Sequence, residues 1–334
     1  MPPIETNTPA LSVGDAHRDV TALKHALQRN GLLERERELD DTLDPETWTA
    51  LYSYAEARAL AWDEEAFEQE EGGVPAAVVD ALLNPDGPLP FEDDDDELIF
   101  DDYPDFATSF GDEQWPELSD IEVFDISGEH ELKKGKKSPR APEKITTIVL
   151  HQTAVKFGTT KSARAKYGER GALHRRFYNV ACHVAALMNG DVLLVNGLRR
   201  YVYHGNSSNR FSIGIEIEGL YAGVAGDPKT VWGKQEPHVL TDRLTFAARR
   251  AVQYAVEEGR KLGCPIEHIQ AHRNYASSRI SDPGSELWSN VAVWAVAELG
   301  LKVDYSLATK GGRAIPAEWD RLGTVDYRGK PLGG

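Results

Sequence analysis

The apolar positions of the chain fall into two blocks, one on each side of a long acidic stretch. In the first block, one face of a helix is indicated by the spacing of Val20, Leu23 and Leu27. The dipeptide Asp44-Pro45 then supplies an N-cap and a first helical residue. A second apolar face follows at Trp48, Leu51, Tyr52 and Ala55. This pattern predicts a small helical unit over residues 11–58.

The second block alternates between strand-like and helix-like patterns. Strands are predicted at 145–150, 180–188, 191–195 and 212–218, and the first of them is an apolar, β-branched run that leads into His151. The dipeptide Asn189-Gly190 between two apolar runs predicts a hairpin. A long helix is predicted at 242–262, and Trp288, Val291, Val293, Trp294 and Val296 predict a closing helix. Strands mixed with helices in one block indicate an α/β domain with a layered sheet.

Two stretches lack such periodicity. Residues 63–142 contain prolines and acidic runs and are predicted to be a linker. The tail after Asp304 has little pattern, although Ile315, Trp319 and Leu322 are candidates for ordering part of it. We therefore divide the chain into a helical domain (1–62), an acidic linker or docking segment (63–142), an α/β domain (143–303) and a tail (304–334).

Charge is distributed very unevenly along the chain. Between Ala59 and Leu132 there are 25 Asp or Glu residues and no Lys or Arg. Subtracting these 25 charges from the net charge of −17 leaves +8 for the rest of the chain. The segment is either a solvated spacer or an element that docks onto a basic partner or onto the protein's own basic domain. No basic stripe or recognised module accompanies the remaining charge, so no nucleic-acid partner is expected.

The composition argues against a membrane-spanning, a signal-peptide-bearing or a disulfide-stabilised protein. No run of about 18 apolar residues exists, so no membrane span is expected. The first residues lack the basic and apolar regions of a signal peptide, and the protein is expected to be made in the cytoplasm. Two cysteines, Cys182 and Cys264, do not make a disulfide framework; two buried thiols are favoured over a single bridge.

Four stretches of the second block carry candidate chemistry. They are Leu150-His151-Gln152-Thr153, Ala181-Cys182-His183, the run from Tyr203 to Gly219, and the run from Gln270 to Gly284. Glu216 and Glu218 are two apart in an apolar strand and so share one face, either a functional face or a solvated one. His272 and Asp282 are ten residues apart. Two histidines with one carboxylate are a ligand set typical of catalytic zinc.

Together, and in this order, these stretches resemble the zinc-dependent N-acetylmuramoyl-L-alanine amidases, the family that also contains the peptidoglycan-recognition proteins. The most specific parts are Ser212-Ile-Gly-Ile-Glu-Ile-Glu-Gly219 and the His272-Arg273…Asp282-Pro283-Gly284 block. The resemblance implies a central mixed β-sheet flanked by helices. It also implies Zn²⁺ as the cofactor, held by His151, His272 and Asp282.

The same resemblance implies the remaining roles. Glu216 would be the general base, and Tyr203, His204 and Asn206 would bind substrate. Many members carry Lys two residues before the ligand Asp, where it stabilises the oxyanion; here that position is Ile280. Arg279 is the candidate to replace it.

The N-terminal block resembles a small three-helix peptidoglycan-binding domain. The matching residues are the Leu11-Ser-Val-Gly14 start, the Val20/Leu23/Leu27 face, Gly31-Leu32 and Pro45-Glu46-Thr47. The family's Gly-x-Phe/Tyr-Gly turn is absent, and Asp41-Thr42-Leu43-Asp44 stands there instead. A purely structural helical bundle is the alternative.

These resemblances imply hydrolysis of the amide between N-acetylmuramic acid and L-alanine in peptidoglycan. The alternatives are a recognition module that binds peptidoglycan without cutting it, and a scaffold built around the acidic segment. Without a signal peptide, the protein would reach the wall as a phage lysin released by a holin or as an antibacterial effector delivered by a secretion apparatus. Segment 63–132 would then dock a delivery or immunity protein.

Overall fold

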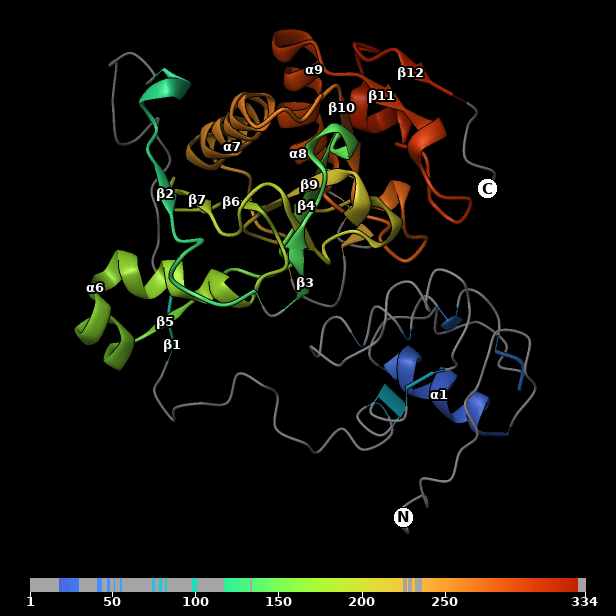
Figure 1. Ribbon diagram of the computed structural model, residues 1–334. Helices are drawn as coiled ribbons and strands as arrows, with labels where there is room; N and C mark the ends of the chain where they lie inside the picture. Colours follow the sequence, from blue (N-terminus) through green and yellow to red (C-terminus); the bar gives the residue numbers. More distant parts are fainter. Residues whose placement is uncertain are drawn as a thin grey trace. The chain divides into compact units, whose positions relative to one another are not determined.

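The chain divides into two compact units, Met1–Asp95 and Asp96–Gly334, which are described separately. The computed structural model (Figure 1) describes residues 18–29, 41–43, 47–48, 51, 55, 74–75, 78–79, 82, 98–100, 117–132, 134–224, 227, 230–231 and 236–329. Most of the acidic segment lies outside the described residues, so its docking role stays a prediction. Among the described residues, no helix combines the length and apolarity that crossing a bilayer requires.

The first unit contains helix α1 (Arg18–Arg29). Its Val20, Leu23 and Leu27 are fully buried, as the spacing predicted. They belong to one apolar cluster, which also contains Ala26, Leu43, Trp48, Leu51, Ala55, Val74, Val78, Val79 and Leu82. The Asp44-Pro45 helix start, Gly31 and Tyr52 lie outside the described residues. Wall binding by this unit remains a prediction.

A six-stranded sheet forms the centre of the second unit. Its strands, in spatial order, are β10 (His268–Ala271), β4 (Thr147–Gln152), β9 (Ser212–Ile217), β6 (Val184–Ala186), β7 (Val192–Leu194) and β2 (Val123–Asp125). β10, β4, β9 and β6 run parallel, whereas β6 and β7 are antiparallel. The sheet is therefore mixed and lies between helices, which confirms the predicted fold class.

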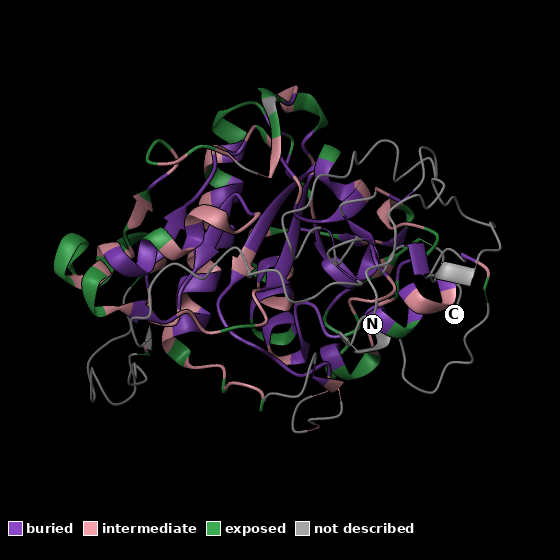
Figure 2. Ribbon diagram, turned by 90° about the horizontal axis from the view of Figure 1, so that it is seen from below, coloured by how far each residue is buried: buried purple, intermediate pink, exposed green. Residues whose placement is uncertain are grey.

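Helices cover the two faces of this sheet differently. Helix α7 (Asp242–Lys261) packs its apolar face against Ile213, Ile215 and Ile217 of β9 and against their neighbours. The opposite face contacts residues of α6 (Lys161–Arg176) and the turn Phe177–Asn179. Figure 1 shows α7 and α6 on opposite sides of the sheet, and Figure 2 shows that the strands at the centre of the unit are buried. Because α7 takes the isoleucines of β9, the polar residues of that strand face the other way.

Three short strand pairs and several helical turns complete the unit. The pairs are β1 (Leu98–Ile99) with β5 (Thr159–Thr160), β3 (Gly135–Pro139) with β8 (Arg200–Val202), and β11 (Val303–Asp304) with β12 (Tyr327–Arg328). Helix α8 (Ser285–Leu287), a π-helical stretch (Trp288–Ala292) and α9 (Val293–Leu299) form a continuous segment. The 3-10 turns are Leu118–Asp120, Pro142–Lys144, Phe177–Asn179, Asn206–Arg210, His272–Asn274, Tyr305–Leu307 and Ala317–Asp320.

Most of the predicted elements of this unit are present. The strands predicted at 145–150, 180–188, 191–195 and 212–218 correspond to β4, β6, β7 and β9, and helix 242–262 corresponds to α7. The Asn189-Gly190 hairpin joins β6 to β7, with Gly190 at a φ of 91°. The predicted closing helix is the α8–α9 segment. Cys182 and Cys264 are buried free thiols, as favoured.

The structure differs from the expectation in the linker and the tail. Val123–Asp125, which lie in the segment predicted to be a linker or docking element, form the edge strand β2, and Ile121 and Val123 pack against the core despite the acidic residues around them. In the tail, Ile315 and Trp319 are buried at 8% and 0% exposure. Leu322 is 92% exposed, so its predicted ordering role was wrong.

Candidate metal centre and active site

Two parallel strands bring the first two candidate ligands together. His151 lies near the end of β4, and His272 follows directly after β10, its parallel neighbour. The carboxyl ends of parallel strands meet at one edge of a sheet, which is where binding sites form in α/β folds. Both imidazoles are buried, at 1% and 4% exposure.

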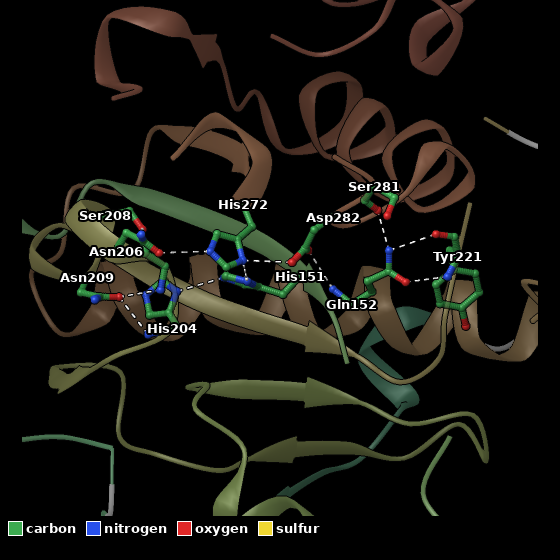
Figure 3. Close-up of polar contacts among 11 residues, drawn as sticks. His151, Gln152, His204, Asn206, Ser208, Asn209, Tyr221, His272, Ser281 and Asp282 are labelled. Atoms are coloured by element: carbon green, nitrogen blue, oxygen red, sulfur yellow. Dashed lines mark hydrogen bonds and ion pairs between the residues drawn. The ribbon is translucent and has the colours of Figure 1, made fainter. Parts of the chain in front are cut away.

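The third candidate ligand, Asp282, converges on the same point. Nδ1 of His272 lies 3.0 Å from Nδ1 of His151 and 2.9 Å from Oδ2 of Asp282. The ligand atoms of all three residues lie within 4.8 Å of one another. Figure 3 shows the three side chains turned toward one another between the sheet edge and the loop above it.

The loop that carries Asp282 is fastened to β4 by Gln152. The main-chain N–H of Gln152 donates to Oδ1 of Asp282 at 3.1 Å. Its side-chain amide donates to the carbonyls of Ser281, at 2.5 Å, and Tyr221, at 3.0 Å, and accepts from the N–H of Tyr221 at 2.5 Å. Oδ1 of Asp282 is thus occupied by a main-chain donor, which leaves Oδ2 directed at the histidines.

Burial shifts the pKa values of the three candidate ligands and so determines their protonation states. It holds the pKa values of His151 and His272 well below the usual histidine value, so both imidazoles are neutral at pH 7. Burial also raises the pKa of Asp282, against the opposing effects of His151 and Arg279. Neutral imidazole nitrogen and carboxylate oxygen are the forms that coordinate metal ions.

Glu216 lies beside the cluster on the same face of the sheet. It is directly opposite His151 in the parallel register of β4 and β9. Its Oε2 is buried and has no hydrogen-bond partner. Burial, reinforced by the charge of Asp282, raises the pKa of Glu216 to about 8. A buried carboxyl with this pKa and a vacant oxygen is suited to exchanging a proton near neutral pH.

Glu218, predicted to share that face, is engaged elsewhere. Its carboxylate accepts the N–H groups of Phe157 at 2.7 Å and of Met188 at 2.9 Å. It therefore joins two loops to the end of β9, and we assign no proton transfer to it.

Arg279 and Ile280 occupy the turn before Asp282. Arg279 is half-buried, and its positive charge lowers the pKa values of Glu216 and Asp282, which indicates that its guanidinium lies near the cluster. Ile280 is 53% exposed. Of the two neighbouring residues, only Arg279 can supply a charged donor to the site.

The predicted substrate-binding residues occupy two different environments. Tyr203 is half-buried, with its ring 5.8 Å from that of Tyr201. His204 and Asn206 are 5% and 7% exposed and lie against the two histidines. Nδ1 of His204 is 3.0 Å from Nε2 of His151, and Oδ1 of Asn206 is 3.5 Å from Nε2 of His272. Contact of these three side chains with a substrate stays a prediction.

A zinc ion fits the donor set. Two nitrogens and one oxygen, each about 2.0–2.2 Å from a tetrahedral zinc ion, would be separated by about 3.3 Å. The separations from His272 Nδ1 to the other two candidate ligand atoms, 3.0 and 2.9 Å, are close to this value, and all three atoms lie within 4.8 Å of one another. The set of two neutral nitrogens and one carboxylate also leaves a fourth position open.

Comparisons with known proteins concern the second unit. Residues 141–285, less than half of the chain, match the family model for N-acetylmuramoyl-L-alanine amidase. No curated protein matches the sequence.

Among solved structures, the endolysin amidase LysCS from Clostridium intestinale URNW is 14% identical, with a TM-score of 0.33, over 54% of this chain and 97% of that one. Drosophila PGRP-LB is 15% identical, with a TM-score of 0.32, over 55% and 96%. Bumblebee PGRP-SA is 15% identical, with a TM-score of 0.32, over 49% and 90%.

Proposed function

We propose that this chain is a zinc-dependent peptidoglycan hydrolase, because its residues 141–285 match the family model for N-acetylmuramoyl-L-alanine amidase. The bond cleaved is the amide between the lactyl group of N-acetylmuramic acid and L-alanine of the stem peptide. The observation that carries the proposal is the convergence of His151, His272 and Asp282 beside Glu216, whose buried Oε2 has no partner.

The proposed metal ligands are His151 Nδ1, His272 Nδ1 and Asp282 Oδ2. A zinc ion bound by them supplies Lewis-acid chemistry, since it polarises a carbonyl group and acidifies water. Its positive charge would also lower the pKa of Glu216 from about 8, because it opposes the effects of burial and of Asp282. This lowering of the pKa favours the carboxylate form, which a general base requires.

Glu216 carries the proton in the proposed reaction. Its carboxylate removes a proton from the attacking water as the new C–O bond forms at the amide carbonyl carbon. It delivers that proton to the nitrogen of L-alanine as the C–N bond breaks. The products are the lactyl carboxylate and a stem peptide with a free amino terminus.

Arg279 is proposed to stabilise the negative charge that develops on the carbonyl oxygen. The support is its position beside Asp282 and its electrostatic effect on four buried groups of the site, His151, Glu216, His272 and Asp282. Donors aimed at a developing oxyanion are among the largest contributors to acyl-transfer catalysis. Tyr203, which is half-buried, is proposed to contact the glycopeptide.

Product analysis tests this proposal. Purified peptidoglycan incubated with the protein should release stem peptides that begin with free L-alanine, identified by amino-terminal labelling and mass spectrometry. The Glu216→Gln variant serves as the control and should release them about 10²- to 10⁴-fold more slowly. Binding to peptidoglycan without new L-alanine amino termini would instead indicate a recognition module that does not cut.

A further inference from the structure

A chain of hydrogen bonds extends behind His151, on the side away from Asp282. Nε2 of His151 lies 3.0 Å from Nδ1 of His204, whose Nε2 lies 3.1 Å from the hydroxyl of Ser212. That hydroxyl donates to the carbonyl of Ser208 at 2.6 Å. His151, His204 and Ser212 are each at most 5% exposed, so water does not replace these bonds. Figure 3 shows His204 and Asp282 on opposite sides of the His151 ring.

The carbonyl of Ser208, at the end of this series of hydrogen bonds, determines the direction of every bond in the series. A main-chain carbonyl can only accept, so the single hydroxyl proton of Ser212 is directed at Ser208. The Ser212 oxygen must then accept from Nε2–H of His204. Nδ1 of His204 is left as an acceptor, and it takes the proton of Nε2–H of His151. His151 consequently carries its proton on Nε2 and presents a lone pair on Nδ1, the atom that faces His272 and Asp282.

His272 has an acceptor of its own beside Nε2, as His151 has in His204. The side-chain oxygen of Asn206 lies 3.5 Å from Nε2 of His272 and can accept from an N–H there. Nδ1 of His272 lies 2.9 Å from Oδ2 of Asp282, so the Nε2–H form is required when a metal ion takes the place of the proton between those two atoms. Asn206 belongs to the same turn, Asn206–Arg210, that provides the Ser208 carbonyl. One short segment, residues 204–212, therefore supplies the acceptors for both histidines.

Glycine at position 214 makes this arrangement possible. A Cβ atom on Gly214 would lie 2.4 Å from Cγ and Nδ1 of His204. Any side chain there would displace the ring that accepts from His151. Gly214 lies in β9, two residues before Glu216, so one strand provides both the proposed base and the space for His204.

We infer that His204, supported by Ser212, and Asn206 are positioning residues that hold His151 and His272 in the Nε2–H tautomer, so that both Nδ1 lone pairs are presented to the metal ion. The inference rests on the proposed metal site, and it assigns to His204 and Asn206 a role that requires no contact with substrate. Partners of this kind fix the ring orientation and tautomer of ligand histidines, and their loss typically weakens metal binding about 10- to 100-fold.

Zinc affinity of the full-length protein tests the inference without reference to catalysis. Competition with a chromophoric chelator should give a zinc dissociation constant about 10- to 100-fold weaker for Ser212→Ala and for His204→Leu. His204→Asn places an amide oxygen near the former Nδ1 position, and it should restore most of the affinity lost in His204→Leu. Thr245→Val is the matched control, because it also removes a buried hydroxyl that donates to a main-chain carbonyl, on α7.

Imidazole ¹⁵N shifts of the metal-free wild-type protein provide the second measurement, and they should show His151 protonated on Nε2. The inference is overturned if His151 is protonated on Nδ1, or if Ser212→Ala binds zinc as tightly as the Thr245→Val control. This test of zinc binding can fail or succeed independently of the test of the proposed amidase activity. A protein that binds zinc with this dependence but releases no L-alanine termini supports the inference and contradicts the amidase proposal.

Discussion

At the residue scale, Glu216 combines two properties that rarely occur together in a stable fold. It is an ionisable group without a partner for its buried Oε2, and burial raises its pKa to about 8. Such a group destabilises the folded state once it is ionised, and carboxyl groups with pKa values shifted in this way are concentrated at functional sites.

The pKa of Glu216 predicts a pH dependence for the metal-free protein. In the unfolded chain this carboxyl ionises near its ordinary value, whereas in the folded chain it holds its proton to about pH 8. The stability contributed by the bound proton is therefore lost as pH rises from about 4.5 to about 8. Glu216→Gln lacks this loss, so its stability relative to the wild type should increase over that range.

Urea denaturation with a chelator present, at several pH values, measures this difference. A difference that does not change with pH would contradict the assigned environment of Glu216. With zinc bound, the same variant should lose about 10²–10⁴ in cleavage rate while keeping its zinc.

Arg279 supports a second prediction. If its guanidinium stabilises the oxyanion, Arg279→Ala should lower kcat about 10²- to 10³-fold with little change in KM or zinc affinity. Adding Ile280→Lys to that variant should restore part of the rate. Ile280→Ala alone is the control and should be near neutral, since this side chain is 53% exposed. Unimpaired kcat in Arg279→Ala would remove the assignment.

The candidate ligands can be predicted from the sequence because each stands out from the residues around it. His151 ends an apolar strand, Glu216 interrupts another, and His272 and Asp282 flank a short loop, so each is conspicuous in the sequence. Gln152 and Ser212 are neutral polar residues with no such signal. Their partners depend on the register of β4 against β9 and on the path of the Asp282 loop, and neither can be read from composition or spacing.

At the scale of elements, the tail supports the loop that carries Asp282, although the tail lies beyond the residues that match the family. The guanidinium of Arg273 donates to the carbonyl of Ile280 and lies 4.8 Å from the ring centroid of Trp319. The N–H of Arg313 donates to the carbonyl of Arg273 at 2.7 Å. Trp319 itself is fully buried and donates its indole N–H to the carbonyl of Gly223.

Trp319→Ala should therefore lower the unfolding free energy by about 3–5 kcal/mol, the cost of deleting a buried aromatic side chain. Leu322→Ala, in the same part of the tail but 92% exposed, should change it by less than about 0.5 kcal/mol. Chemical denaturation of both variants provides the comparison. Equal stabilities would show that the tail does not contribute to the core.

Elements with a strong period were predictable, and those without one were not. Helix α7 has a continuous apolar face, and the Asn189-Gly190 turn identifies its hairpin. Helix α6 was missed because it buries only Ala172, Leu173 and His174 among many charged residues. Strands β2 and β8 have three residues each, too few to display alternation, and they depend on pairing with distant strands.

At the scale of the whole molecule, every residue assigned to the site lies in the unit Asp96–Gly334. A fragment comprising this unit should therefore cleave a soluble muramoyl peptide with the kcat/KM of the full chain. On insoluble cell wall, the full chain should be the faster of the two if the first unit binds wall, as its resemblance implies. A large loss of activity on the soluble substrate would show that the site depends on the first unit.

In the proposed site, His151, His272 and Asp282 hold one zinc ion on which cleavage depends. The most direct measurement is the release of L-alanine amino termini from peptidoglycan by metal-free protein during titration with zinc. We predict that the rate rises to a plateau at one equivalent of zinc, and that His151→Ala neither retains zinc nor releases these termini. Full cleavage by metal-free protein, or zinc retained by His151→Ala, would contradict the proposed zinc site.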